Sequence, residues 1–214
     1  KIKFCSEFIN KLNYDKYFFK PTLEGITEAG SKLQLGFSCY GLKFFYLSGQ
    51  WEKLADVEKI NWTNTINGYQ TQDSKFPQNS YVDENYIYYL NKFKIQKFLK
   101  ESVKSLLNNT GVKSFDSKSV FDRKSINAET KQAISTLFQV RSQNTYQVEP
   151  EFDNSNIIQY LNELDWSHPW ASGAQYSSIC VYSSTQNSYD AELLKDFSDD
   201  LVDIESGFYF FSKP

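Results

Sequence analysis

Histidine, methionine and cysteine are all scarce in this sequence of 214 residues. It contains one histidine, no methionine and 3 cysteines, and no two cysteines form a Cys-x-x-Cys pair. Zinc sites need several Cys or His ligands at short spacings, so the composition argues against a Cys/His metal site, and we expect no cofactor. An odd number of widely separated cysteines is typical of buried free thiols in a reducing compartment. This predicts a cytoplasmic protein in which Cys5, Cys39 and Cys180 are buried.

An excess of basic residues and long apolar runs are also missing. The 23 Lys and Arg residues face 26 Asp and Glu residues, which gives a formal net charge of −3. Capture of a phosphate backbone relies on positive charge, so we expect no nucleic acid partner. No stretch approaches the ~18 consecutive apolar residues of a membrane helix, and the first residues lack the apolar core of a signal peptide. We therefore expect neither a membrane span nor export.

Two catalytic signatures are absent as well. The sequence has no glycine-rich phosphate loop and no Gly-x-Ser-x-Gly elbow. His168 is the single imidazole that could act as a base. These absences argue against most nucleotide-dependent enzymes and against serine hydrolases.

The chain is instead rich in aromatic side chains with helical spacing. Aromatic residues make up 17% of the sequence, which indicates a packed globular protein. Only 5 Pro and 9 Gly occur, and apolar residues repeat mostly at three and four, so we expect an all-α protein. The pattern predicts amphipathic helices over residues 3–19 and 91–107. Two more are predicted after the capping candidates Asn127 and Asn154, with apolar stripes formed by Ile134, Leu137 and Phe138 and by Ile157, Ile158, Leu161 and Leu164.

The three longest segments without formal charge are residues 33–42, 60–72 and 169–189. A helix that lacks charge on every side is expected to be covered by other protein. Charged outer helices over uncharged inner helices, joined by short connections, predict antiparallel helical hairpins in two layers. We expect residues 1–214 to form a single helical domain of this kind.

Two segments resemble the α/α-toroid superfamily, which includes the six-hairpin glycosidases and the terpenoid cyclases. They are Asp165-Trp166-Ser167-His168-Pro169-Trp170-Ala171-Ser172-Gly173-Ala174-Gln175 and Asp203-Ile204-Glu205-Ser206-Gly207-Phe208. The first is loosely similar to the Trp-x-Arg-Gly-Gln segment of unsaturated glucuronyl hydrolases, with Ser172 in place of the arginine, so that arginine's role in substrate binding is not implied. The resemblance implies a partial α/α-toroid. Because the chain has fewer inner helices than a full toroid, we expect half a toroid, a fragment, or a helical layer resting on another domain.

The densest group of candidate site residues lies at the entry to the uncharged segment 169–189. Asp165 stands beside Trp166, and a carboxylate held against indole in a dry cleft can act as a general acid. Tryptophan faces also stack on sugar rings. We therefore take Asp165 as catalytic and a set of neighbours as substrate-binding: Trp166, His168, Trp170 and Gln175. The alternative is a helix-start cap with Pro169 in the first turn and both tryptophans packed.

A glycosidase needs a second carboxylate across the scissile bond. Asp73 and Asp83, the latter followed by Glu84, are the candidates, because inner helix ends on one side of a toroid converge on one cavity. Solvated loop charge is the alternative interpretation of these acids. Tyr69 is the candidate substrate-binding tyrosine on this side, and Tyr81 and Tyr86 either line the same cleft or pack between layers.

A third acidic motif is Asp199-Asp200-Leu201-Val202-Asp203, which matches the DDxxD pattern of all-α isoprenoid synthases. Aspartates at i and i+4 share a helix face, and their oxygens suit Mg²⁺. Only 11 residues follow Asp203, too few for the second metal motif of those enzymes. The motif is therefore also consistent with the acidic solvent face of an outer helix.

These observations predict a carbohydrate-active or polysaccharide-biosynthesis domain that acts on or binds a glycan or sugar derivative. General acid/base chemistry like that of a glycoside hydrolase is the catalytic version of this hypothesis. The alternative is a non-catalytic helical domain that binds a glycan, a protein partner or an adjoining domain. Two carboxylates within ~10 Å across a cleft favour hydrolysis, whereas one or none favours binding. Mg²⁺-dependent isoprenoid chemistry is the third hypothesis.

Overall fold

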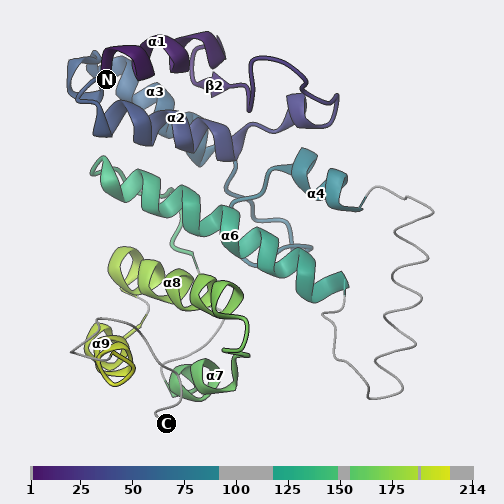
Figure 1. Ribbon diagram of the computed structural model, residues 1–214, viewed down its shortest axis with the longest axis vertical. Helices are drawn as coiled ribbons and strands as arrows, with labels where there is room; N and C mark the ends of the chain where they lie inside the picture. Colours follow the sequence, from purple (N-terminus) through teal and green to yellow (C-terminus); the bar gives the residue numbers. More distant parts are fainter. Residues whose placement is uncertain (1, 92–117, 149–154, 188, 203–214) are drawn as a thin grey trace. The chain divides into compact units, whose positions relative to one another are not determined.

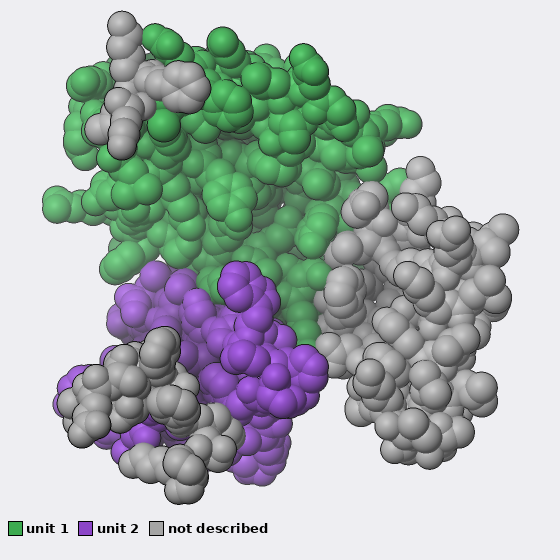
Figure 2. Space-filling view, in the orientation of Figure 1, with its two compact units in different colours: residues 1–145 green, residues 146–214 purple. Residues whose placement is uncertain are grey.

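The structure is a computed structural model that describes residues 2–91, 118–148, 155–187 and 189–202 (Figure 1). It divides into two compact units, residues 1–145 and residues 146–214, each of which is described by itself (Figure 2). The described residues are mostly helical, which confirms the predicted helical character. The toroidal arrangement and the single domain stay predictions.

Unit 1 (residues 1–145) contains five described α-helices and one β-hairpin. In chain order the elements are α1 (Ile2–Leu12), β1 (Asn13–Asp15), β2 (Phe18–Phe19), α2 (Leu35–Leu47), α3 (Asp56–Asn67), α4 (Glu84–Asn91) and α6 (Lys118–Gln139), with short 3-10 helices at Gly30–Lys32 and Trp51–Lys53. Helix α2 is at the centre, since it packs against α3, α6 and β2.

The single helix predicted over residues 3–19 is wrong in its second half. Helix α1 ends at Leu12, and the chain turns into an antiparallel hairpin in which Asn13 pairs with Phe19. The Asn13 side chain donates to the carbonyl of Lys16 at 2.7 Å, and Lys16 has a φ of 39°. An asparagine that bonds nearby backbone favours a turn over a continuing helix. The hairpin brings Phe19 into the core, where it is buried.

Aromatic rings around Trp62 form the core of unit 1. The Trp62 ring centroid lies 5.0 Å from that of Phe45, 5.5 Å from Tyr17, 5.8 Å from Phe19 and 6.1 Å from Trp51. Its indole N–H donates to the hydroxyl of Ser38 on α2 at 3.1 Å, so the polar atom of this buried residue is satisfied. Gly41 faces Phe19 so closely that a Cβ at this position would overlap the ring.

Two of the segments predicted as inner helices lie in unit 1. Segment 33–42 falls mainly in α2, where Leu35, Ser38, Cys39, Gly41 and Leu42 are buried but Tyr40 is exposed, so this helix is covered on most sides and not on all of them. The inner helix expected in segment 60–72 is wrong in its bounds, because α3 begins in charged sequence at Asp56 and ends at Asn67. Ile60 is exposed, so α3 is covered on one side only.

Helix α6 starts earlier than the sequence pattern predicted. Asn127 lies inside this helix rather than capping it, since the buried Ile126 and Thr130 continue the packed face in both directions. Ile134 and Leu137 are buried as expected, whereas Phe138 is exposed. The helix predicted over 91–107 begins at the last residue of α4 and otherwise lies outside the described residues.

Unit 2 (residues 146–214) contains α7 (Ile157–Glu163), α8 (Pro169–Gln186) and α9 (Ala191–Asp199) among its described residues. Ile157 and Leu161 of α7 are buried as predicted, and the helix follows Asn156; the capping candidate Asn154 lies outside the described residues. Pro169 opens α8, and Asn187 with a φ of 51° ends it. A left-handed asparagine is a common helix stop.

The prediction that 169–189 is covered on every side is wrong. Four polar residues of α8 are buried, namely Ser172, Ser178, Ser183 and Gln186, but Trp170, Ala171 and Ala174 are exposed. The serines of the buried face satisfy their hydroxyl groups by donating to backbone carbonyls. Ser178, for example, donates to the carbonyl of Ala174 at 2.9 Å.

The three cysteines differ in their burial. Cys39 is buried and Cys180 is partly buried, whereas Cys5 is exposed, which corrects the expectation for that residue. None of the helices in the described ranges is both long and apolar enough to cross a membrane.

Candidate functional site

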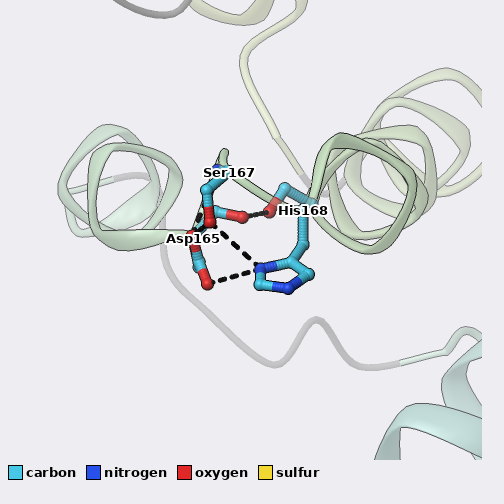
Figure 3. A network of polar contacts seen from close by, with 4 residues as sticks. Asp165, Ser167 and His168 are labelled. Carbon is cyan, nitrogen blue, oxygen red and sulfur yellow. Dashed lines mark hydrogen bonds and ion pairs between the residues drawn. The ribbon is translucent and has the colours of Figure 1, made fainter.

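The predicted group around Asp165 forms a compact polar turn between α7 and α8 (Figure 3). Both the amide and the hydroxyl of Ser167 donate to Oδ1 of Asp165, at 3.1 and 2.5 Å. Nδ1 of His168 lies 2.8 Å from Oδ2 of Asp165 and 3.1 Å from the Ser167 hydroxyl. Ser172 donates from the first turns of α8 to the Asp165 carbonyl at 2.8 Å.

The geometry of this turn does not match a serine-hydrolase triad. In a triad the serine and the aspartate occupy opposite nitrogens of the imidazole, whereas here Asp165 and Ser167 share Nδ1 of His168. The hydrogen bond from Ser167, followed by that from His168, lowers the pKa of Asp165. A general acid needs a raised pKa, so its proposed catalytic role gains no support from its surroundings, and it stays a prediction.

The predicted substrate-binding residues of unit 2 lie in different environments. Trp166 is partly buried, donates its indole N–H to the carbonyl of Leu161 at 2.8 Å and has its ring 6.3 Å from that of Phe197. Trp170 is 92% exposed, and Gln175 is partly buried in α8. Trp166 thus packs as the alternative interpretation expected, while Trp170 is free to contact a ligand.

Asp73, Asp83 and Tyr69 belong to unit 1, whereas the Asp165 group belongs to unit 2. Asp73 lies on an exposed turn, accepts from the amide of Lys75 at 3.0 Å and lies 3.5 Å from the Lys75 ammonium. The Lys75 amide is the main cause of the lowered pKa of Asp73. Asp73 therefore has the character of solvated loop charge.

Asp83 is different, because its side chain is buried, with 1% of the residue exposed. Its Oδ2 accepts from the amides of Gln34 and Leu35 at the start of α2, at 2.7 and 3.2 Å. Its Oδ1 accepts from the amide of Asn85 in the first turn of α4 at 3.1 Å. One carboxylate therefore caps two helix N-termini, where negative charge is favoured.

Tyr69 is connected to the same place through Gln34. Its hydroxyl donates to Oε1 of Gln34 at 2.8 Å, next to the amide that Asp83 binds. Burial, followed by the negative charge of Asp83, raises the pKa of Tyr69 above its usual range. The structure thus brings together two of the predicted residues of unit 1, Asp83 and Tyr69.

A residue that the sequence interpretation missed, Glu129, completes this cluster. It lies on α6, and its Oε2 accepts from the backbone amide of Asp83 at 3.2 Å. Its Oε1 makes no hydrogen bond to the described part of the chain. The pKa of Glu129 is raised from 4.5 to about 8, mainly by burial. The hydrogen bond from the Asp83 amide lowers this pKa, and the negative charge of Asp83 raises it.

Glu129 borders a pocket of about 310 Å³ between α2, α4 and α6, which we call the Glu129 pocket. It is lined by Leu33, Gly36, Phe37, Tyr40, Asp83, Tyr86, Ser125, Ala128, Glu129 and Gln132. The small residue Gly36 leaves open space, since a Cβ there would meet no atom within 4 Å. Next to it, the side-chain amide of Gln132 donates to the carbonyl of Gly36 at 3.0 Å and ties α6 to α2.

A signal for this pocket is present in the sequence. Two sets of lining residues follow the spacing i, i+3, i+4, i+7. The set in α2 and just before it is Leu33, Gly36, Phe37 and Tyr40, and the set in α6 is Ser125, Ala128, Glu129 and Gln132. Such spacing places each set on one helix face. The sequence does not show that these two helix faces lie opposite each other, so the pocket itself is visible only in the structure.

Metals and known relatives give no further assignment. Within the described residues, no group of three or more His, Cys, Asp and Glu side chains could hold a metal ion. Asp199 and Asp200 are exposed at the end of α9, and Asp203, the third residue of the DDxxD motif, lies outside the described residues. Comparisons with protein-family models, with curated proteins and with solved structures gave no match to this chain.

Proposed function

We propose that unit 1 is a binding unit whose Glu129 pocket takes a sugar-sized ligand, with a glycan or sugar derivative as the ligand class. The observation that carries this proposal is the combination of aromatic and polar groups in one pocket. Phe37, Tyr40 and Tyr86 supply ring faces, and Glu129 and Gln132 supply polar atoms. Ligand sites are typically apolar clefts of roughly 300–1,000 Å³ with a few placed polar groups.

The aromatic lining suits the apolar faces of a sugar ring. The rings of Phe37 and Tyr40 have centroids 6.4 Å apart and are inclined by 48°, so they form a corner on α2 rather than a flat stack. Tyr86 comes from α4. Tyr40 is 60% exposed, and this large exposed ring beside a pocket is available to a ligand.

Binding is favoured over hydrolysis by the environment of the two carboxyl groups. A glycosidase needs one carboxyl as acid and a second as nucleophile or base. Both oxygens of Asp83 already accept backbone amides, so among the described lining residues only Glu129 has a carboxyl oxygen without a hydrogen bond. Glycan hydrolysis and the α/α-toroid architecture remain predictions of the resemblance.

Titration of the full chain with neutral monosaccharides and disaccharides, followed by ligand-observed NMR or calorimetry, tests this proposal. The informative variant is Tyr86→Ala, which removes a lining ring. The matched control is Tyr88→Ala, because Tyr88 lies on the same helix, is 70% exposed and does not line the pocket. We expect Tyr86→Ala to weaken sugar binding about tenfold, in line with the ~1–1.4 kcal/mol of one aromatic contact, and Tyr88→Ala to leave it unchanged.

Two results would overturn the proposal. One is that no sugar binds the wild-type chain, although circular dichroism shows it folded. The other is that sugars bind but that Tyr86→Ala and Tyr88→Ala have equal affinity, which would place the site elsewhere, for example at the exposed Trp170.

A further inference from the structure

We propose that the ligand of the Glu129 pocket carries a positively charged amine, as an amino sugar does, held against the Glu129 carboxylate between the rings of Tyr40 and Tyr86. This inference rests on the proposed function and narrows its ligand class. It follows from three features of the pocket: its charge, its ring faces and the unused oxygen of Glu129.

The charged side chains among the described lining residues of the pocket are all acidic. Two of the described lining residues are acidic, Asp83 and Glu129, and the same set contains no Lys, Arg or His. Lys43, on α2 beyond Tyr40, donates to the hydroxyl of Ser135 at 3.3 Å. The described lining therefore offers no cation to balance the two carboxyl groups, and a cationic ligand supplies one.

Among the described residues, the titratable groups whose electrostatic interaction with Glu129 is resolved are an acid, a tyrosine and a cysteine. Asp83, Tyr69 and Cys39 all interact electrostatically with it across the junction of α2, α6 and the segment before α4. Tyr40 and Tyr86 are the remaining titratable groups of the lining. None of these side chains can carry a positive charge, so none of them repels a cation at this position.

The rings give the second part of the recognition. Aromatic faces attract cations through their negative quadrupole, and this attraction strengthens where water is excluded. Phe37, Tyr40 and Tyr86 lie on two helices that border the pocket. A neutral sugar gains stacking from these rings, whereas an amino sugar gains stacking and the cation–ring attraction together.

The free oxygen of Glu129 gives the third part. Oε2 is held by the Asp83 amide at 3.2 Å, which fixes the carboxyl group, and Oε1 remains for a ligand. Burial beside another acid favours the protonated carboxyl in the empty pocket. A bound ammonium group reverses this preference, so binding is accompanied by release of the Glu129 proton to solvent. No covalent bond is formed or broken.

The test compares ligands that differ in one group, which is cationic in one member of each pair and neutral in the other. Glucose, galactose and mannose are titrated at pH 7 beside their 2-amino-2-deoxy counterparts, and choline is titrated beside its neutral isostere 3,3-dimethylbutan-1-ol. Each series is measured with the wild-type chain, with Glu129→Gln and with Glu84→Gln. Glutamine at 129 keeps an oxygen for the Asp83 amide, and Glu84 is an exposed acid next to Asp83 that does not line the pocket.

We expect the cationic member of each pair to bind at least tenfold more tightly, and Glu129→Gln but not Glu84→Gln to abolish this preference. Equal binding of neutral and amino sugars, with Tyr86→Ala still weakening both, overturns the inference and leaves the proposed function intact. Binding of choline without any sugar supports the cation site and overturns the glycan assignment. No binding of any probe by the folded wild-type chain overturns both.

Discussion

The backbone amide of Asp83 donates to Oε2 of Glu129 at 3.2 Å, while the Asp83 side chain accepts from the first amides of α2 and α4. Asp83 therefore connects three helices, α2, α4 and α6, at one point. The same connection holds Glu129 at the edge of its pocket. Fold and candidate site share this junction, and each can be tested separately.

Replacing Asp83 with Ala should destabilise unit 1 by about 2–4 kcal/mol. The substitution removes three hydrogen bonds to a charged acceptor and leaves the buried amide of Leu35 and the partly buried amide of Gln34 without this acceptor. Hydrogen exchange at the start of α2, measured by mass spectrometry, should accelerate. The exposed Glu84→Ala is the control, and it should change stability by less than about 1 kcal/mol. Equal exchange in both variants would show that Asp83 does not hold the junction.

The stability of unit 1 should fall as pH rises from about 5 to 8. Glu129 has a pKa of about 8 in the folded chain against an ordinary value of 4.5, so between these values the folded state binds more protons than the unfolded state. Free energy of unfolding then decreases with pH, by at most ~1.4 kcal/mol per pH unit for one proton. Below about 4.5 and above about 8 this contribution is constant.

The measurement is urea unfolding at several pH values for the wild-type chain and for Glu129→Gln. The side chain at position 129 cannot ionise in this variant. The decrease in the free energy of unfolding between pH 5 and 8 should therefore be smaller than in the wild-type chain. Identical slopes in both proteins would show that Glu129 titrates normally and that its carboxyl group is solvated.

Two glycines of α2 should respond to alanine in opposite directions. A Cβ at Gly41 overlaps the ring of Phe19, so Gly41→Ala should cost about 1–3 kcal/mol by forcing a buried ring to move. At Gly36 a Cβ meets nothing within 4 Å, so Gly36→Ala should stabilise the helix by about 0.5–1 kcal/mol. Thermal unfolding followed by circular dichroism gives both signs, and two changes of the same sign would contradict the packing of β2 on α2.

Replacing Asp165 with Asn should leave sugar affinity within about twofold of wild type, a difference of less than ~0.5 kcal/mol. Asp165 is an exposed turn residue of unit 2, whereas the proposed site lies in unit 1. Calorimetry with whichever sugar binds the wild-type chain provides the measurement. A loss of binding in this variant would return the site to the segment from Asp165 to Gln175.

Sequence pattern predicted the helices whose apolar faces are regular. Ile134 and Leu137 on α6 and Ile157 and Leu161 on α7 are buried where a 3.6-residue period places them. The hairpin after α1 could not be predicted in this way. Phe19 fits a helical pattern, but it lies in a strand where it contacts Trp62 and Gly41, which are distant in sequence. Local periodicity contains no information on such contacts.

The candidate site could be predicted only in part. Asp83 was identified as an acid of interest, but its burial depends on the approach of α2 to α4, and its role as a cap for both was not visible. Glu129 was missed because a single carboxylate on a helix is usually solvated. The absence of charge in 169–189 predicts full burial, whereas the exposed face of α8 carries uncharged side chains such as Trp170, Ala171 and Ser184.

The most direct test of the account is a ligand titration of the wild-type chain and of Gly36→Leu, whose side chain would fill the Glu129 pocket from α2. The panel of neutral and amino sugars is followed by ligand-observed NMR, and circular dichroism confirms that both proteins are folded. We expect saturable binding to the wild-type chain and none to Gly36→Leu. Equal binding to the two proteins would contradict the claim that unit 1 holds its ligand in this pocket.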